Sequence, residues 1–433
     1  MCYAIPGKVE AIDDKFVTVN YFGERKKALN ELAGLAVGDY IYAQGGFVIE
    51  KISPQEAEDI LTTWRELFFE LQDLDVRLSR VELEKQGVDK KLGLILDKAT
   101  DGKSLSREEY LYLLNLDDLP AKQLFYKTAN FLRQKYHGNA CCVHGIIEIS
   151  NYCGSNCAYC GIADSVTGLQ RYRMTGKEII ETAVEAVEKY GFKALVLQSG
   201  EDRGYTAGEL AGIIKEIKSR AAVLLFISFG EMAKKDLQEL YAAGARGLLM
   251  RFETSNPELY RKIHPGAELN ERLQVIRNAA DLGYLIVTGG LVGLPGQTKE
   301  DILNDLYLAR ELKSEMLSFG PCIPHPQTPL AQLPLPQEDD ILKVLALCRF
   351  MDPEKGNVVV TTGLETISPD ARRKGLLAGA NSVMLNVTPL EYRKLYSIYP
   401  NRAHENETIA IQIAEVVSLL KSIGRAPTDL GRF

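Results

Sequence analysis

The most informative stretch of this sequence is Asn151-Tyr-Cys-Gly-Ser-Asn-Cys-Ala-Tyr-Cys-Gly161. It contains Cys153, Cys157 and Cys160, which are separated by three and then two residues. A [4Fe–4S] cluster usually takes four thiolates, so three thiolates on one loop leave one iron open to bind a small molecule. Zinc is the alternative, although structural zinc usually takes four protein ligands and no second Cys-x-x-Cys pair is present. A disulfide framework is not expected, because three clustered cysteines cannot pair evenly.

This cysteine spacing, with Tyr159 before the third cysteine, resembles the radical SAM enzymes. The resemblance implies one [4Fe–4S] cluster and S-adenosylmethionine (SAM) as cofactors. It further implies that SAM chelates the open iron, and that one electron from the cluster cleaves SAM to methionine and a 5′-deoxyadenosyl radical. A cluster kept for electron transfer or for structure is the remaining alternative.

Composition places the chain among ordinary globular proteins, since 46% of its 433 residues are hydrophobic and 25% are charged. The net charge of −7 and the pI near 5.5 argue against a nucleic-acid surface. No apolar run reaches the roughly 18 residues of a membrane span, and the first residues do not resemble a signal peptide. We therefore expect a cytoplasmic protein that binds neither nucleic acid nor membrane, with eight cysteines that are thiols or metal ligands.

Residues 1–65 are expected to form a small all-β barrel domain with a trailing helix. Short strands are predicted over residues 9–21, where a turn at Asp13-Asp14 divides two of them, and over residues 37–44 and 46–52. Ser53 and Pro54 then supply the N-cap and first position of a helix, with Glu56 completing the start signal.

This segment resembles the HypC family of hydrogenase maturation chaperones through Met1-Cys-Tyr-Ala-Ile-Pro-Gly-Lys-Val9 and Gly46-Phe-Val-Ile-Glu-Lys-Ile52. In that family the cysteine after Met1 helps to bind an iron that carries cyanide and carbon monoxide, a role that the resemblance implies for Cys2. Gln44 stands where such chaperones often carry a histidine. A docking role without metal is therefore the alternative for this domain, and Cys2 would then be a small packed residue.

The remainder is expected to contain a charged helical linker over residues 66–135 and an α/β unit over residues 136–433. Strands and helices alternate eight times in this unit, which predicts a TIM-type (β/α)8 barrel that folds without residues 1–65. The predicted strands are 143–150, 194–198, 223–228, 247–252, 284–288, 316–319, 358–361 and 383–386. Barrel sites form at the C-terminal strand ends, where this chain has Gln198, Ser199, Glu231, Arg251, Glu253, Thr361, Thr362 and Asn386.

From about residue 93 to 400 the chain resembles HydE, the radical SAM maturase family of [FeFe]-hydrogenase, and more distantly biotin synthase. The most specific segments are Arg251-Phe-Glu-Thr254 and Gly320-Pro-Cys-Ile-Pro-His-Pro-Gln-Thr-Pro329. The resemblance implies maturation of a hydrogenase metal centre, with an iron–cysteine complex carrying CO and cyanide as substrate and other maturation proteins as partners. Two alternatives are another radical SAM reaction on an amino acid, such as sulfur insertion or rearrangement, and a non-catalytic iron–cyanide scaffold.

The same resemblance implies the roles of individual residues. Glu253 would contact the SAM ribose or amino group, and Arg272 would pair with the SAM carboxylate. The other residues implied to surround SAM are Tyr159, Gln198, Ser199, Met384 and Tyr396. Arg251, Thr361 and Thr362 would hold the carboxylate of an amino-acid-like substrate, although an ion pair with Glu253 is the alternative for Arg251. Cys322 is expected to be a buried packing residue, and iron ligation in the barrel mouth is the alternative.

Overall fold

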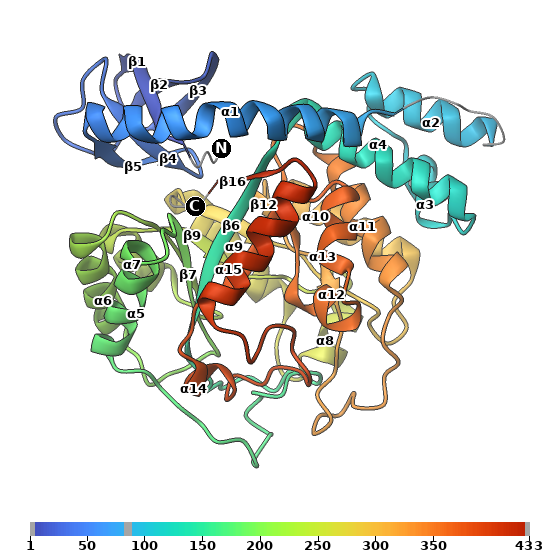
Figure 1. Ribbon diagram of the computed structural model, residues 1–433. Helices are drawn as coiled ribbons and strands as arrows, with labels where there is room; N and C mark the ends of the chain where they lie inside the picture. Colours follow the sequence, from blue (N-terminus) through green and yellow to red (C-terminus); the bar gives the residue numbers. More distant parts are fainter. Residues whose placement is uncertain (1–4, 82–88, 429–433) are drawn as a thin grey trace.

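The largest unit in the computed structural model, which describes residues 5–81 and 89–428, is a closed barrel of parallel strands (Figure 1). Eight strands within these residues form it in chain order, and the last pairs back onto the first. They are β6 (Ala140–Ser150), β7 (Ala194–Ser199), β8 (Leu224–Ser228), β9 (Ala245–Leu249), β10 (Leu285–Thr288), β12 (Met316–Leu317), β14 (Asn357–Val360) and β15 (Ser382–Asn386). Each predicted strand overlaps one of these, so the predicted (β/α)8 barrel is confirmed.

Helices connect the barrel strands and cover their outer face. They are α5 (Gly176–Glu188), α6 (Ala207–Arg220), α7 (Lys234–Ala243), α8 (Pro257–Ile263), α9 (Leu269–Leu282), α10 (Lys299–Glu311), α11 (Glu338–Met351), α12 (Thr362–Ile367), α13 (Ala371–Leu377), α14 (Leu390–Arg393) and α15 (Ile409–Ser422). Short strands β11 (Leu291–Val292) and β13 (Gly320–Pro321) pair beyond the barrel rim, and β16 (Ala426–Pro427) pairs with the start of β6.

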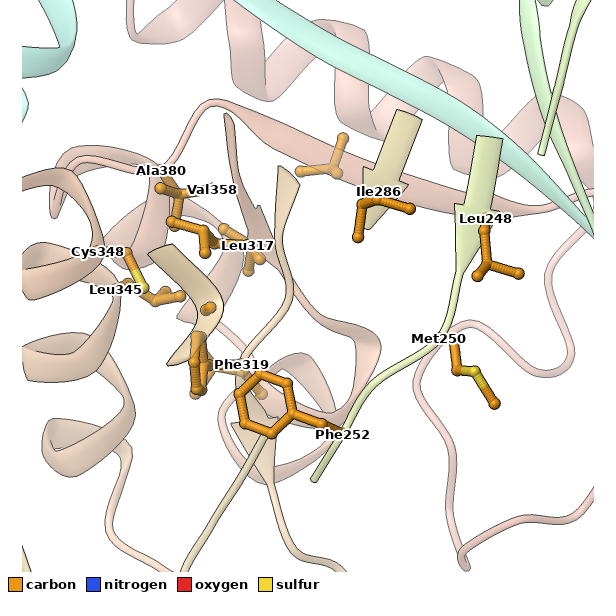
Figure 2. Close-up of a cluster of buried hydrophobic side chains, with 14 of the residues drawn as sticks. Leu248, Met250, Phe252, Ile286, Leu317, Phe319, Leu345, Cys348, Val358 and Ala380 are labelled. Atoms are coloured by element: carbon orange, nitrogen blue, oxygen red, sulfur yellow. The ribbon is translucent and has the colours of Figure 1, made fainter. Parts of the chain in front are cut away.

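Successive residues along a barrel strand point to opposite faces and pack in two different layers of the core. Leu317 and Val358 belong to the outer layer, where Leu345 and Cys348 of α11 pack near them (Figure 2). Their neighbours Met316 and Val359 belong to a second apolar cluster. This period of two is the pattern of strands that are buried on both faces.

The N-terminal segment forms the small closed β barrel that the sequence predicts. Its strands are β1 (Gly7–Asp13), β2 (Phe16–Tyr21), β3 (Glu24–Leu29), β4 (Tyr40–Gln44) and β5 (Phe47–Ile52), paired in the order β1-β2-β3-β5-β4. The prediction missed β3, because Glu-Arg-Lys-Lys-Ala-Leu lacks apolar alternation and only Ala28 among its six residues is buried. Tertiary pairing with β2 and β5 makes this segment a strand.

Helices α1 (Pro54–Ser79), α2 (Lys90–Thr100), α3 (Arg107–Leu114) and α4 (Leu119–His137) join the two barrels. The Ser53 hydroxyl accepts from the backbone N–H of Glu56, as its N-cap role requires. Helix α1 is continuous across residues 65 and 66, so one element belongs to both segments of the predicted domain division. In the described residues we find no helix with the length and apolar character to cross a bilayer.

The small barrel packs on the end of the large barrel at which the parallel strands begin (Figure 1). Tyr42, Phe47 and Ile49 join one apolar cluster with Leu224 and Phe226 of β8. The approach is close, because a Cβ added at Gly45 in the β4–β5 turn would lie 2.7 Å from Leu285 Cδ1. Ion pairs between Lys193 and Glu50 (2.8 Å) and between Arg246 and Glu31 (2.9 Å) flank the cluster.

A further connection joins helix α1 to α4 and to the end of the large barrel, and it is charged and fully buried. Asp75 of α1 accepts from Arg133 of α4 (2.6 and 2.7 Å) and from Arg425 after α15 (2.9 Å), and all three side chains are at most 1% exposed. Removal of residues 1–65 would expose the apolar cluster, and a truncation that also removes the rest of α1 would leave two buried cations without this carboxylate. The apolar contact argues against the expectation that the large barrel folds without residues 1–65, which stays a prediction.

Candidate active site

A cavity of about 320 Å³ lies at the C-terminal ends of the barrel strands. Of the fifteen residues predicted for the site within the large barrel, fourteen line this one cavity: Cys153, Cys157, Tyr159, Cys160, Gln198, Ser199, Arg251, Glu253, Arg272, Thr361, Thr362, Met384, Asn386 and Tyr396. The exception is Glu231, which contacts the Arg272 guanidinium at 3.3 Å. Cys2, the remaining candidate, lies outside the described residues. The fold thus brings together side chains from positions 153 to 396.

The cysteine loop follows β6 directly and is held by a nearby polar anchor. The Asn151 side chain donates to the carbonyls of Gln170 (2.9 Å) and Leu395 (2.7 Å) and accepts from Tyr172 N–H (2.7 Å). The guanidinium of Arg171 donates to the carbonyls of Asn151 (2.5 Å) and of three later loop residues. The Arg171-Tyr-Arg-Met-Thr segment therefore fixes the shape of the cysteine loop, a role that the sequence did not reveal.

The other side of the cysteine loop is held by the turn after β7. A Cβ added at Gly200 would lie 2.7 Å from Cys153 Cβ, so only glycine permits this approach. Glu201 N–H donates to Cys153 Sγ (3.4 Å), and the Glu201 carboxylate accepts from the Ser155 hydroxyl (2.6 Å). The Ser199-Gly-Glu-Asp turn thus supports the first cysteine.

The three sulfurs are better spaced for a polynuclear cluster than for one ion. One group of three His, Cys, Asp or Glu side chains in the described residues has ligand atoms all within 4.8 Å of one another, and it is His404, Glu407 and Glu415 rather than the cysteines. Tetrahedral zinc, with Zn–S bonds near 2.3 Å, would bring its sulfurs within about 4 Å of one another. The donor set therefore fits a cluster of several irons, which three thiolates can hold.

Burial disfavours the thiolate form of the loop cysteines when no metal is bound. Burial raises the pKa of Cys160 to about 12, and burial together with the Cys160 and Cys153 thiolates raises the pKa of Cys157 well above its ordinary range. Binding of a metal to such thiols releases protons, and the positive charge of the metal compensates for the burial of thiolate.

Glu253 presents an unsatisfied carboxylate oxygen to the cavity. Its side chain is 5% exposed, and its Oε2 has no hydrogen-bond partner among the described residues. Its backbone has φ of 68°, an unusual value for glutamate that is often found at functional sites. A buried carboxylate oxygen of this kind needs a donor, which an amine or a sugar hydroxyl of SAM can supply. The site therefore fits SAM at this position.

Two arginines lie next to Glu253. Arg251 Nε is 3.4 Å from Glu253 Oε1, so the ion pair considered as an alternative for Arg251 is present. Arg272 Nε donates to the carbonyl of Arg251 (2.6 Å), and its Nη1 lies 3.3 Å from Glu231 Oε1. A nearly buried guanidinium in this position can bind the carboxylate of an amino acid.

Thr361 and Thr362 line the cavity from the strand end of β14. Thr361 is the N-cap of α12, and its hydroxyl accepts from Leu364 N–H (3.4 Å). On the opposite wall Gln198 donates to the Tyr396 hydroxyl (3.2 Å). The cavity thus presents hydroxyl, amide and guanidinium groups around a space next to the cysteine loop.

The sequence analysis missed two charged residues of the cavity wall and one histidine beside the cysteines. Glu148 accepts from Arg402 (2.8 and 3.0 Å), and both side chains are about 5% exposed. His264 Nδ1 lies 3.2 Å from Cys157 Sγ. These contacts join residues that are 254 and 107 positions apart, so no local sequence signal could have indicated them. Cys322 is fully buried beside Leu291 and packs as expected.

Comparison with known proteins agrees with this geometry. Residues 147–309 match the radical SAM superfamily, residues 1–64 the HupF/HypC family, and residues 318–417 the Biotin and Thiamin Synthesis associated domain. The [FeFe] hydrogenase maturase subunit HydE of Thermotoga maritima is 39% identical over 333 residues, which are 77% of this chain and 94% of that protein. The crystal structure of methylornithine synthase (PylB) has a TM-score of 0.66 at 27% identity, over 77% of this chain and 97% of that one.

A crystal structure of HydG, a maturase of the [FeFe]-hydrogenase, has the same fold, with a TM-score of 0.61 at 22% identity over 75% of this chain and 72% of that one. The fold and the matches define a radical SAM enzyme, a class that uses a [4Fe–4S] cluster and SAM. Within that class the chain belongs to the family of the hydrogenase maturase HydE, with an N-terminal HypC-type domain fused to it.

Proposed function

We propose that this protein matures the metal centre of an [FeFe]-hydrogenase by radical SAM chemistry on a small iron–amino-acid complex. The observation that carries the proposal is the convergence on one cavity of three half-buried thiols, a nearly buried guanidinium and a carboxylate oxygen that has no hydrogen-bond partner among the described residues. The 39% identity with a HydE protein favours hydrogenase maturation over other uses of such a cavity.

Cys153, Cys157 and Cys160 are the ligands of the cluster in this proposal. Three thiolates hold three of four irons, so the fourth remains open toward the cavity. When bound and reduced, the cluster supplies the electron that cleaves SAM. The protein contributes the fixed loop that Asn151 and Arg171 anchor, and it shields the sulfurs from water.

SAM is held on the wall that carries Glu253 and Arg272. The Glu253 Oε2 atom accepts from the ribose or amino group of SAM, and the Arg272 guanidinium pairs with its carboxylate. Gln198, Met384 and Tyr396 line the same cavity and limit where SAM can lie. These residues orient SAM toward the open iron and exclude water from it.

The substrate is held by Arg251, Thr361 and Thr362, and it is an iron–cysteine complex that carries CO and cyanide. Two hydroxyl groups and a guanidinium are suitable donors to a carboxylate. Because Arg251 already lies near Glu253, a bound substrate carboxylate would share this guanidinium with the SAM side of the cavity. That coupling places the substrate close to the reacting part of SAM.

A second candidate is a rearrangement of an amino acid that carries no iron. The similarity to methylornithine synthase favours it, since that structure covers 77% of this chain at 27% identity. Both candidates need the carboxylate-binding groups, and they differ in whether the substrate contains iron. An assay with both kinds of substrate separates them.

The HypC-type domain docks a partner maturation protein rather than passing iron through the barrel. Its contact with the large barrel is an apolar layer that includes Phe226 and Val359, and Val359 also lines the cavity. Packed interiors of this kind leave no path for a charged complex. The partners in this proposal are other hydrogenase maturation proteins, and the compartment is the cytoplasm.

The decisive experiment is anaerobic reconstitution of the full chain with iron and sulfide, followed by addition of SAM, reductant and the iron–cysteine complex. We expect about four irons per chain and release of 5′-deoxyadenosine, measured by mass spectrometry. Cys157→Ala should lose both, while Cys322→Ala, which removes a buried thiol outside the cavity wall, should retain both. SAM cleavage by the Cys157→Ala protein would overturn the proposal.

The docking role has its own test in Cys2→Ala within the full chain. A docking domain tolerates this change, because docking needs no thiolate ligand, and hydrogenase maturation should continue. Loss of maturation with normal SAM cleavage would instead show that Cys2 is an iron ligand, since a methyl group cannot replace a thiolate.

A further inference from the structure

His264 contacts one of the three loop sulfurs although it stands far from the cysteine motif. It is the C-cap of α8, and its Nδ1 lies 3.2 Å from Cys157 Sγ. The His264 side chain is 6% exposed. The sulfur of Cys157 therefore faces a ring nitrogen, in a region that water does not reach freely.

Aromatic neighbours hold the ring of His264 in this orientation. The ring stacks on Tyr260 with centroids 4.6 Å apart and an angle of 23°, and it meets Tyr159 edge-on at 5.8 Å. The backbone is fixed as well, since the Ile263 carbonyl accepts from Ala158 N–H in the cysteine loop (2.8 Å). Ring contacts and a backbone hydrogen bond thus both hold the imidazole next to the Cys157 sulfur.

The orientation of the ring decides which nitrogen meets the sulfur, and it is Nδ1 that lies toward Cys157 Sγ. A cysteine thiolate can only accept, which favours the tautomer with the proton on Nδ1. The other nitrogen, Nε2, is buried without a hydrogen-bond partner among the described residues, so a proton there would be an unsatisfied donor.

We propose that His264 is a positioning residue that donates its Nδ1–H to the Cys157 thiolate of the bound cluster and thereby raises the reduction potential of the cluster. The inference rests on the proposed ligation by Cys157. Reduction adds negative charge that spreads onto the ligand sulfurs, so an N–H dipole aimed at one sulfur stabilises the reduced form more than the oxidised form. Hydrogen bonds to sulfur are among the features that set cluster potentials.

The test compares a variant of His264 that lacks the N–H donor with a variant that keeps a donor. His264→Phe keeps an aromatic ring between Tyr260 and Tyr159 but removes the N–H, while His264→Asn keeps a side-chain amide donor near the Nδ1 position. Reconstituted proteins are compared by iron content and by redox titration of the cluster with electron paramagnetic resonance, without SAM. In His264→Phe we expect unchanged iron and an approximately tenfold lower ratio of reduced to oxidised cluster at a fixed potential, equal to about 59 mV for one electron.

His264→Asn should recover most of that shift, and Tyr260→Phe is the matched control. It retains the stacked ring and removes a hydroxyl that has no hydrogen-bond partner among the described residues, so its potential should equal that of the wild type. A wild-type potential in His264→Phe, or an equal decrease in the Phe and Asn variants, would overturn the donor role. If His264→Phe lost its iron, His264→Asn would decide, because a wild-type potential supports the role and a lowered one refutes it. Failure of the ligand assignment is recognised separately, by a full cluster in Cys157→Ala.

Discussion

Replacement of Asp75 by asparagine should weaken the packing of α1 on the large barrel and destabilise the chain. The side chain keeps its shape but loses its charge, which leaves the guanidinium groups of Arg133 and Arg425 buried without a counter-ion. Burial and the nearby Arg133 guanidinium already lower the pKa of Arg425 to about 10, so the charge of Arg425 is only partly compensated in the native protein. Breaking a buried ion pair by removing one partner costs roughly 3–5 kcal/mol.

The expected decrease in the free energy of unfolding for Asp75→Asn is about 3 kcal/mol, near the lower end of this range. The reason is that the Asn130 side-chain oxygen still accepts from Arg133 Nη2 (2.7 Å) and Arg425 Nη2 (2.7 Å) in the variant. Asp75 is otherwise enclosed, because the α1 helix that carries it lies against α4.

Urea unfolding of the full chain measures this loss, and urea is preferred because guanidinium chloride would screen the charges. Trp64 is the single tryptophan and lies on α1, so its fluorescence reports on the N-terminal segment, while circular dichroism reports on the whole chain. Asp73→Asn is the matched control, since Asp73 and its partner Arg77 are both more than 60% exposed and should contribute at most about 0.5 kcal/mol. A decrease in the free energy of unfolding below about 1 kcal/mol in Asp75→Asn would show that the buried ion pairs of Asp75 do not stabilise the chain as argued.

Three further outcomes are expected. A chain that lacks residues 1–89 should aggregate, because it exposes the apolar end of the large barrel, and a monodisperse folded product in gel filtration would contradict the packing argument. Arg272→Ala should weaken SAM binding in equilibrium dialysis by about tenfold or more, while Arg251→Ala should weaken it less and impair substrate turnover; equal losses would show that the two roles are misassigned. A hydrogen bond to Glu365 raises the pKa of His404 above its ordinary value of 6.5, so its contribution to stability is complete below pH 6.5 and is lost as the pH rises through the folded-state pKa. Thermal unfolding across this range should show that decline in the wild type, and a decline of the same size in His404→Gln would contradict it.

The sequence by itself was sufficient for the architecture and for most of the cavity. Strand and helix patterns depend on residues that are close in the chain, so each of the eight barrel strands could be located before the structure was known. The ends of those strands carry the polar residues, and a parallel barrel necessarily brings those ends to one rim. The cysteine spacing is also local, which is why the loop could be recognised directly.

The tertiary structure was needed for every feature that depends on residues far apart in the chain. The strand β3 has no apolar alternation and exists because β2 and β5 pair with it. The packing of α1 on the large barrel depends on Asp75 and Arg425, which are 350 positions apart. The contact of His264 with Cys157 joins residues 107 positions apart. A local pattern shows which face of an element is apolar, but it does not show which other element covers that face or which charge meets which. Those pairings follow from the packing of the whole chain, because a buried charge or sulfur is stabilised by whichever group the fold places beside it.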